Sequence, residues 1–136
     1  YFYIRFKLNK IDRKNALGFF FDASLDGYKY GLNLYNPDAG GMNRIRDYIL
    51  NHKPAARGVI EAFNGTGLLE MQGEKYQRAS YPKEDIVLRE WLERKRISFI
   101  QEENLNAAFY KREMLDKIFS AFDSVNEVYF MLKEAL

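Results

Sequence analysis

Tyrosine and basic side chains gather in two stretches of the chain, residues 28–46 and 75–81. An arginine guanidinium presents a fork of donors that matches a carboxylate or a phosphate, and a tyrosine offers a ring for stacking and a hydroxyl. If the helix after the first stretch packs beside residues 74–81, the two stretches form a pocket for an anionic ligand. The candidate ligand-binding residues are Tyr28, Tyr30, Arg44, Arg46, Lys75, Tyr76, Arg78 and Tyr81.

The same residues have a plainer interpretation, which we favour from the sequence alone. Tyrosines on a sheet face form cross-strand aromatic pairs, and arginines at the rim of the sheet pair with surface acids. Geometry separates the two interpretations. The pocket requires Arg44, Arg78 and Tyr30 to lie within about one side-chain length of each other, with the arginines not paired to acids.

The segment Asp38-Ala39-Gly40-Gly41 stands between a predicted strand and a predicted helix, where many proteins hold a phosphate. However, Asn36 is suited to an N-cap, Pro37 to the first helical position and Asp38 to the first turn. The aspartate would repel a phosphate, and no Lys-Ser/Thr pair follows as a P-loop requires. The segment therefore predicts a capped helix start, with an anion site as the alternative.

Few residue types in the chain are suited to catalysis or metal binding. The chain has no cysteine and one histidine, which excludes disulfides, thiolate catalysis, Cys-ligated zinc and a multi-histidine metal site. Neither Gly-x-Ser-x-Gly nor His-Glu-x-x-His occurs. The acids are scattered, and spacing sets no pair of them at the separation that acid–base hydrolysis needs. We therefore predict no metal and no cofactor, and we assign no catalytic residue. His52 is expected to interact with the last carbonyls of a helix.

The cluster Arg94-Lys95-Arg96 could contact the phosphates of nucleic acid. Basic residues also suit the C-terminus of a helix, and we favour that interpretation. The net charge is only +2, and charges of both signs alternate along most helices. Because nucleic-acid domains concentrate positive charge on one face, we expect no nucleic-acid partner. Trp91, one turn before the cluster, is predicted to lie in the core.

The composition indicates one folded domain over residues 1–136. Hydrophobic residues make up 47% of the chain and aromatics 16%, which is too much apolar surface for a disordered segment. The longest run without a charge, residues 15–21, is far shorter than the roughly 20 apolar residues of a membrane span. No signal-peptide pattern opens the chain. We therefore expect a soluble, cytoplasmic protein with no membrane contact.

Alternating apolar residues predict strands in the first third of the chain. Residues 1–8 alternate from the first position, so we expect residues to precede Tyr1 and the chain to be the C-terminal part of a longer protein. Residues 9–18 read as a loop. Residues 19–25 and 28–35 then form two strands joined at Asp26-Gly27, which is typical of a tight hairpin. On the second of these strands, Tyr28, Tyr30, Leu32 and Leu34 share one side.

From residue 37 onward a helical period takes over. Helices are predicted from residue 37 to before Pro54, from 54 to 63 and from 83 to 95, with Trp91 facing inward in the last of these. A short strand with a turn at Gln72-Gly73 and a possible return strand covers 68–79, and another strand covers 96–100. The last thirty residues predict two helices with a break near Asp123, where Ser124 and Glu127 match a capping box. Strands followed by helices predict an α+β fold: a largely antiparallel sheet with helices packed on one face and a helical C-terminus.

The order of these elements resembles a known family. The strings "FFFDASLDGYKYGLNLYNP", "MNRIRDYI", "LEMQGEKYQR", "WLERKRISF" and "MLDKIFSAFDSVNEVYFML" are similar to the bacterial domain-of-unknown-function family 2461. The resemblance covers essentially the whole chain. It implies a longer domain with a mainly helical N-terminal part. The chain departs from the family where the latter tends to have Arg-Pro-Pro-Lys-Gly, since here residues 78–83 read Arg-Ala-Ser-Tyr-Pro-Lys. The family has no established activity, so the resemblance implies a fold and not a function.

Two kinds of function follow from these patterns. The leading prediction is a ligand- or protein-binding α+β module with no recognisable catalytic motif. The alternative is an enzyme acting on an anionic small molecule, with catalytic groups partly in a segment before Tyr1. Partners are therefore an anionic small molecule or another protein, and the sequence leaves the oligomeric state open.

Overall fold

The computed structural model of the protein describes residues 14–104 and 112–136. Helices and strands follow one another in the order β1–β2–α1–α2–β3–α3–β4–α4–α5 in these two ranges. The strands are β1 (Ala16–Ala23), β2 (Gly27–Tyr35), β3 (Glu70–Gln72) and β4 (Ser98–Asn104). The helices are α1 (Ala39–Asn51), α2 (Lys53–Thr66), α3 (Ile86–Leu92), α4 (Arg112–Ser124) and α5 (Asn126–Ala135). The strand predicted for residues 1–8 lies outside the described residues, as does the first half of the loop predicted for 9–18.

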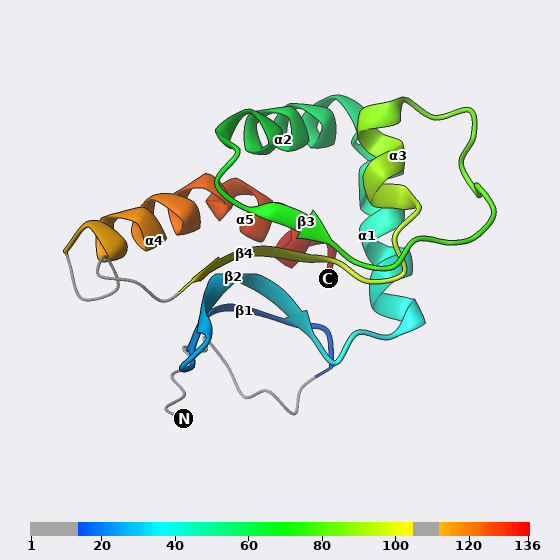
Figure 1. The fold of residues 1–136 in the computed structure, drawn as a ribbon. Helices are drawn as coiled ribbons and strands as arrows, with labels where there is room; N and C mark the ends of the chain where they lie inside the picture. The colour runs from blue at the N-terminus through cyan, green and yellow to red at the C-terminus, as the bar shows by residue number, and fades with distance from the viewer. Residues whose placement is uncertain (1–13, 105–111) are drawn as a thin grey trace.

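The strands form one antiparallel sheet in the order β1-β2-β4-β3. The helices lie on one face of this sheet, with α1 and α3 side by side at one end and α4 leading toward the other (Figure 1). The predicted α+β class, the antiparallel sheet and the helical C-terminus are therefore confirmed. None of the helices in the described ranges is both long and apolar enough to cross a membrane.

The predicted hairpin of β1 and β2 is confirmed. The backbone N–H of Ser24 donates to the carbonyl of Gly27 across the turn at 2.9 Å. Tyr28, Tyr30, Leu32 and Leu34 point to the buried side of β2, as the alternation predicted. The predicted loop over 9–18 is wrong at its end, because Ala16 to Gly18 already pair with β2.

The core lies between the sheet and the helices. Phe99 of β4 is fully buried, with its ring 5.2 Å from those of Trp91 on α3 and Phe63 on α2 (centroid to centroid). Trp91 is only 2% exposed, which confirms its predicted place in the core. At the β1 side of the sheet, Phe19 packs against Tyr129 of α5 at 5.3 Å.

Helix α1 begins two residues later than the sequence indicates. Its N-cap is Asp38 and not Asn36, and the Asp38 carboxylate accepts the N–H of Gly41 at 2.7 Å. Asn15, distant in sequence, fixes this cap, since its side-chain amide donates to Asp38 Oδ1 and its Oδ1 accepts the Asp38 N–H. Hydrogen bonds from the Asn15 amide, which has the larger effect, and from the Gly41 N–H hold the pKa of Asp38 below its ordinary value. The glycine segment is thus a helix start, as predicted, with the cap at a different residue.

The C-terminal break is confirmed, but its capping box is wrong. Helix α4 ends at Ser124 and α5 begins at Asn126, with Val125 as an N-cap that makes no side-chain hydrogen bond. The Ser124 hydroxyl instead donates to the carbonyl of Ala121, within α4, at 2.6 Å.

The region between α2 and β4 differs most from prediction. Helix α2 continues to Thr66 and ends at Gly67, which has a left-handed φ of 63°. Helix α3 covers only residues 86–92 of the predicted 83–95, because Asp85 caps it through the N–H of Val87. The predicted return strand after β3 does not form, and β4 runs on to Asn104 beyond the predicted end at residue 100. His52, as predicted, meets a helix-end carbonyl: its Nδ1 lies 2.9 Å from the Tyr48 oxygen.

Candidate functional site

A loop between β3 and α3, residues 73–85, wraps around the C-terminal end of α3. Its first part pairs with the chain that leaves the helix: Tyr76 N–H donates to the Glu93 carbonyl at 2.9 Å, and Lys95 N–H donates to the Glu74 carbonyl at 2.7 Å. An isolated antiparallel bridge joins Lys75 to Arg94. This pairing replaces the return strand that the sequence predicts after β3.

Glu93 anchors the second part of the same loop. This residue ends α3 and is only 7% exposed. Its carboxylate accepts the backbone N–H groups of Ser80, at 2.8 and 3.0 Å, and of Tyr81, at 2.6 Å. A buried carboxylate is stable only when such donors surround it. Glu93 therefore determines where residues 80 and 81 cross the end of the helix.

Helix α3 presents two different faces because of its 3.6-residue period. Leu88, Trp91 and Leu92 lie in the core. The positions 86, 89, 90 and 93 form a stripe on the other face, toward the loop. Together with the loop they line an open hollow of about 210 Å³, which we call the α3 hollow. Its lining residues are Lys75, Tyr76, Gln77, Ala79, Ile86, Arg89, Glu90 and Glu93.

Most charged side chains of the α3 hollow already have protein partners. Lys75 Nζ lies 2.7 Å from Glu90 Oε2, and Arg94 also approaches that oxygen at 3.5 Å. Arg94 in addition donates to the carbonyls of Gly73 and Glu90. These interactions stabilise the rim of the hollow and leave little free charge there.

Arg89 is the exception. Its Nε atom is buried and has no hydrogen-bond partner, and its side chain forms no ion pair with any residue in ranges 14–104 and 112–136. Buried polar groups in proteins nearly always have partners, and a native exception calls for a specific reason. A ligand in the α3 hollow would supply one.

The eight residues predicted to bind a ligand fall into separate places. Three of them meet at the α3 hollow or directly behind it: Lys75, Tyr76 and Arg46. Arg46 is 4% exposed and donates to the Tyr76 hydroxyl at 3.0 Å, to the Arg94 carbonyl at 2.6 Å, to the Leu92 carbonyl at 3.0 Å and to Asn43 at 2.8 Å. Its guanidinium also lies 5.2 Å from the centroid of the Tyr76 ring. It therefore holds Tyr76 and the end of α3 to α1, and four of its five N–H donors are occupied.

The other five predicted residues do not line the α3 hollow. Tyr28 and Tyr30 lie in the core near the hairpin end of β2, where burial raises the pKa of both hydroxyls. Arg44 is exposed on α1, and Arg78 is exposed on the loop. Tyr81 packs against the core through its ring and is held by Glu93 through its backbone. The structure thus brings together one part of the predicted set.

Sequence reasoning missed Arg89, Ile86 and the role of Glu93. Arg89 had no signal of its own, because one arginine on the polar side of a predicted helix is ordinary. Glu93 did have a signal in the sequence, because the dipole of a helix disfavours an acid at the C-terminal end. An acid in that position therefore indicates a specific donor set nearby.

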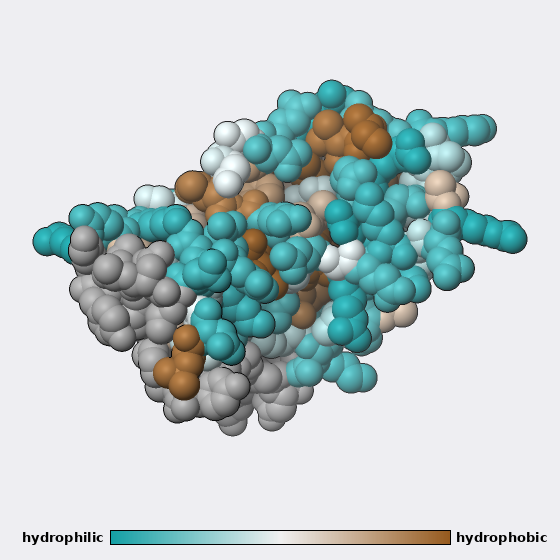
Figure 2. Space-filling model, viewed as in Figure 1, coloured by the Kyte–Doolittle hydropathy of each residue, from teal (hydrophilic) through white to brown (hydrophobic). Residues whose placement is uncertain are grey.

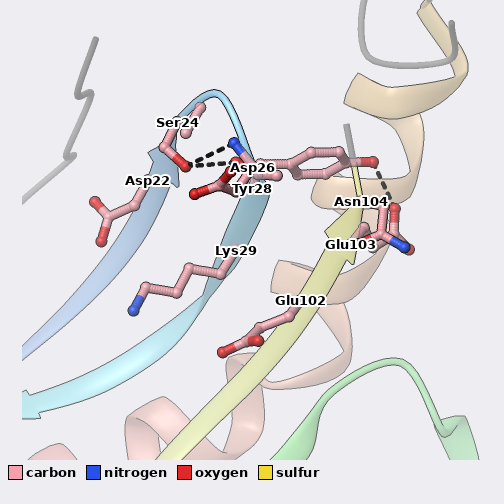
Figure 3. A pocket seen from close by; sticks show the side chains of 10 residues that line it. Asp22, Ser24, Asp26, Tyr28, Lys29, Glu102, Glu103 and Asn104 are labelled. Atoms are coloured by element: carbon pink, nitrogen blue, oxygen red, sulfur yellow. Dashed lines mark hydrogen bonds between the residues drawn. The ribbon is translucent and has the colours of Figure 1, made fainter. Parts of the chain in front are cut away.

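A second hollow lies at the hairpin end of the sheet and is wider, about 760 Å³ (Figure 3). Asp22, Lys29 and Glu102 occupy paired positions across β1, β2 and β4. Tyr28 points away from them and donates to Glu103 at 2.5 Å, and Glu103 also pairs with Lys117 of α4. The acids of its lining, Asp22, Asp26, Glu102 and Glu103, would repel an anion. No group of three acids or histidines suited to a metal ion occurs in the described residues.

The surface around α3 is mixed in character. Hydrophilic residues cover most of the face seen in Figure 2, and a hydrophobic patch lies where α2 and α3 adjoin. Ile86, at the start of α3, is 62% exposed, and Tyr76 is 38% exposed. The α3 hollow thus has one free cation together with apolar side chains that are open to solvent.

The fold and the hollow define a small α+β domain with a candidate binding site beside a short helix. The chain belongs to the family described as "Conserved hypothetical protein (DUF2461)", whose model matches residues 1–130. This match confirms the resemblance seen in the sequence. Comparisons with the curated proteins and with the solved structures gave no match.

Proposed function

We propose that the protein is a binding module that holds an anionic small molecule in the α3 hollow through Arg89. One observation carries the proposal: Arg89 lines this hollow with a part-exposed side chain that forms no ion pair within residues 14–104 and 112–136, and its Nε has no hydrogen-bond partner there. Only the Nε of the part-exposed Arg89 is buried, and a buried N–H without a partner costs about 1–3 kcal/mol. An anionic ligand offers the guanidinium the acceptors that the described part of the chain does not.

Binding explains the hollow better than catalysis does. The two carboxylates of the lining are occupied, Glu93 by two backbone N–H groups and Glu90 by Lys75. A general acid or base must be free to meet the substrate. We extend the proposal to a single α+β domain over residues 1–136 and to a bacterial origin, as the family resemblance implies. We also propose a cytoplasmic location, which the absence of cysteine supports. Nucleic acid is not part of the proposal, because Arg94 and Lys95 are already bonded within the fold.

The proposal is tested by titrating the 136-residue chain with small anions and following backbone amide chemical shifts. We expect shifts at residues 75–79 and 86–93, and a rise in the melting temperature, because a ligand of the native state stabilises it by mass action. The variant Arg89→Gln should bind the anion about tenfold or more weakly, because a charge-assisted hydrogen bond contributes about 1.5–3 kcal/mol. The amide shifts and the rise in melting temperature should then require a correspondingly higher anion concentration.

Arg96→Gln is the matched control. This arginine is exposed, follows α3 closely in the chain and does not line the α3 hollow. It should leave the titration unchanged. Equal losses in both variants would mean that only overall charge matters, and the proposal would be wrong. The same conclusion follows if no anion perturbs the amides of the hollow.

A further inference from the structure

The charges that line the α3 hollow indicate which kind of anion it takes. We infer that its ligand is a small monocarboxylate with an apolar body, and that phosphates and other dianions are disfavoured; this rests on the proposed function. Four observations carry the inference, namely the charge balance, the fixed position of Glu93, the apolar lining and the size.

The lining holds two cations, Lys75 and Arg89, and two acids, Glu90 and Glu93. Lys75 is paired with Glu90 at 2.7 Å, so Arg89 is the one cation of this lining left for a ligand. A single guanidinium matches a single negative charge, and its fork binds the two oxygens of a carboxylate side by side. The second charge of a phosphate would find no cation of its own.

Glu93 makes the exclusion of a dianion stronger, because it cannot move away. Both of its oxygens accept backbone N–H groups of the loop, and the residue is buried. Glu90 at the rim adds a second negative charge, although its side chain is 44% exposed and therefore screened by solvent. Like charges close to a ligand are a common way to reject the wrong partner.

Apolar contact is available beside the cation. Ile86 is the first residue of α3 and stands one turn before Arg89, and the Tyr76 ring lines the loop side. Both side chains are exposed. A ligand that binds Arg89 through its carboxylate can therefore cover Ile86 and Tyr76 with an apolar or aromatic body, which removes apolar surface from water.

The size of the hollow favours a small ligand. Its volume of about 210 Å³ lies below the roughly 300–1,000 Å³ of most small-molecule pockets. A nucleotide or a large cofactor would extend far outside it. A single ring carrying a carboxylate is the kind of ligand that this volume suits.

Three probes with the same ring separate the possibilities: benzoate, phenyl phosphate and benzamide. Each is titrated into the 136-residue chain near pH 7.5, where a phosphate with a second pKa of about 6 is a dianion. We expect benzoate to bind, phenyl phosphate to bind about tenfold more weakly and the neutral benzamide not to bind. Binding is read from the amide shifts of residues 75–79 and 86–93.

Two variants test the reason for this preference. Arg89→Lys keeps the charge but loses the fork, so benzoate affinity should fall about tenfold. Glu90→Gln removes a rim charge and releases Lys75. The affinity for phenyl phosphate should therefore rise several-fold, and the affinity for benzoate should rise less. Neither residue contributes to the core, and unchanged melting temperatures without ligand show that both variants fold.

The outcomes are distinct. If phenyl phosphate binds as tightly as benzoate, the carboxylate inference is overturned while anion binding stands. If neither anion shifts the amides of the hollow, the proposed function fails together with it. A preference for benzoate that survives unchanged in Arg89→Lys would show that the ring and not the carboxylate is recognised, which also overturns the inference.

Discussion

At the scale of single residues, Arg46 shows how a predicted ligand anchor serves the fold. Its guanidinium donates to two backbone carbonyls, a tyrosine hydroxyl and an asparagine side chain. A buried arginine with this many acceptors is stable, whereas its loss leaves buried carbonyls without donors. The neighbouring arginine on α1, Arg44, is exposed and has no such role. Residue type alone does not distinguish the two.

We expect Arg46→Met to lower the free energy of unfolding by about 2–4 kcal/mol, because the carbonyls of Leu92 and Arg94 lose their donor in a buried place. Chemical denaturation followed by circular dichroism measures the change. Arg44→Met is the matched control and should stay within about 0.5 kcal/mol of the parent. A loss in Arg46→Met as small as in the control would show that these hydrogen bonds contribute nothing to stability.

At the scale of elements, helix α2 shows what two glycines do in different backbone conformations. Gly58 lies inside the helix, and Gly67 follows its end with a φ of 63°. A methyl group added at either position would meet no atom within 4 Å. Any difference between the two alanine variants therefore comes from the backbone conformation and not from crowding.

Gly58→Ala is expected to raise the free energy of unfolding by about 0.5–1 kcal/mol, since alanine is the better helix former. Gly67→Ala should lower it by about 1 kcal/mol, because a left-handed conformation is unfavourable for residues with a Cβ atom. Denaturation of the two variants side by side measures both changes. Effects of the same sign would contradict the assigned end of α2.

Arrangement of elements also explains the errors of sequence-based prediction. Apolar residues at every second position correctly predicted β1 and β2. Apolar residues at helical spacing correctly predicted α1, α2 and the paired C-terminal helices. The N-cap of α1 was wrong because Asn15, far away in the chain, selects Asp38. The return strand after β3 was wrong because its residues pair with the end of α3 instead. Both errors arise from contacts between distant segments.

At the scale of the whole molecule, one aromatic cluster joins the sheet to the helices. Phe99 of β4 contacts Phe63 of α2 and Trp91 of α3, and it is fully buried. Trp91 is the one tryptophan in the 136-residue sequence, so its fluorescence reports on this cluster directly. The exposed Phe119 of α4 offers a contrast outside the core.

We expect Phe99→Ala to lower the free energy of unfolding by about 3–5 kcal/mol, because it removes a buried ring and leaves a cavity. The native Trp91 emission should also shift to longer wavelength as its surroundings loosen. Phe119→Ala should change stability by about 0.5 kcal/mol or less. Urea titrations followed by fluorescence and by circular dichroism test both statements, and similar losses in the two variants would argue against this core.

The sequence by itself determined the family, the α+β class, the hairpin, the helix stripes and the burial of Trp91. These follow from local periodicity and turn residues, which act over a few positions in the chain. Only the tertiary structure decided the candidate site. Glu93 holds Ser80 and Tyr81, and Arg46 holds Tyr76, through contacts between segments that the sequence does not show to be neighbours. Arg89 is a candidate because the fold leaves its buried Nε without a hydrogen-bond partner. No pattern of residue types in the sequence shows which donor will lack a partner.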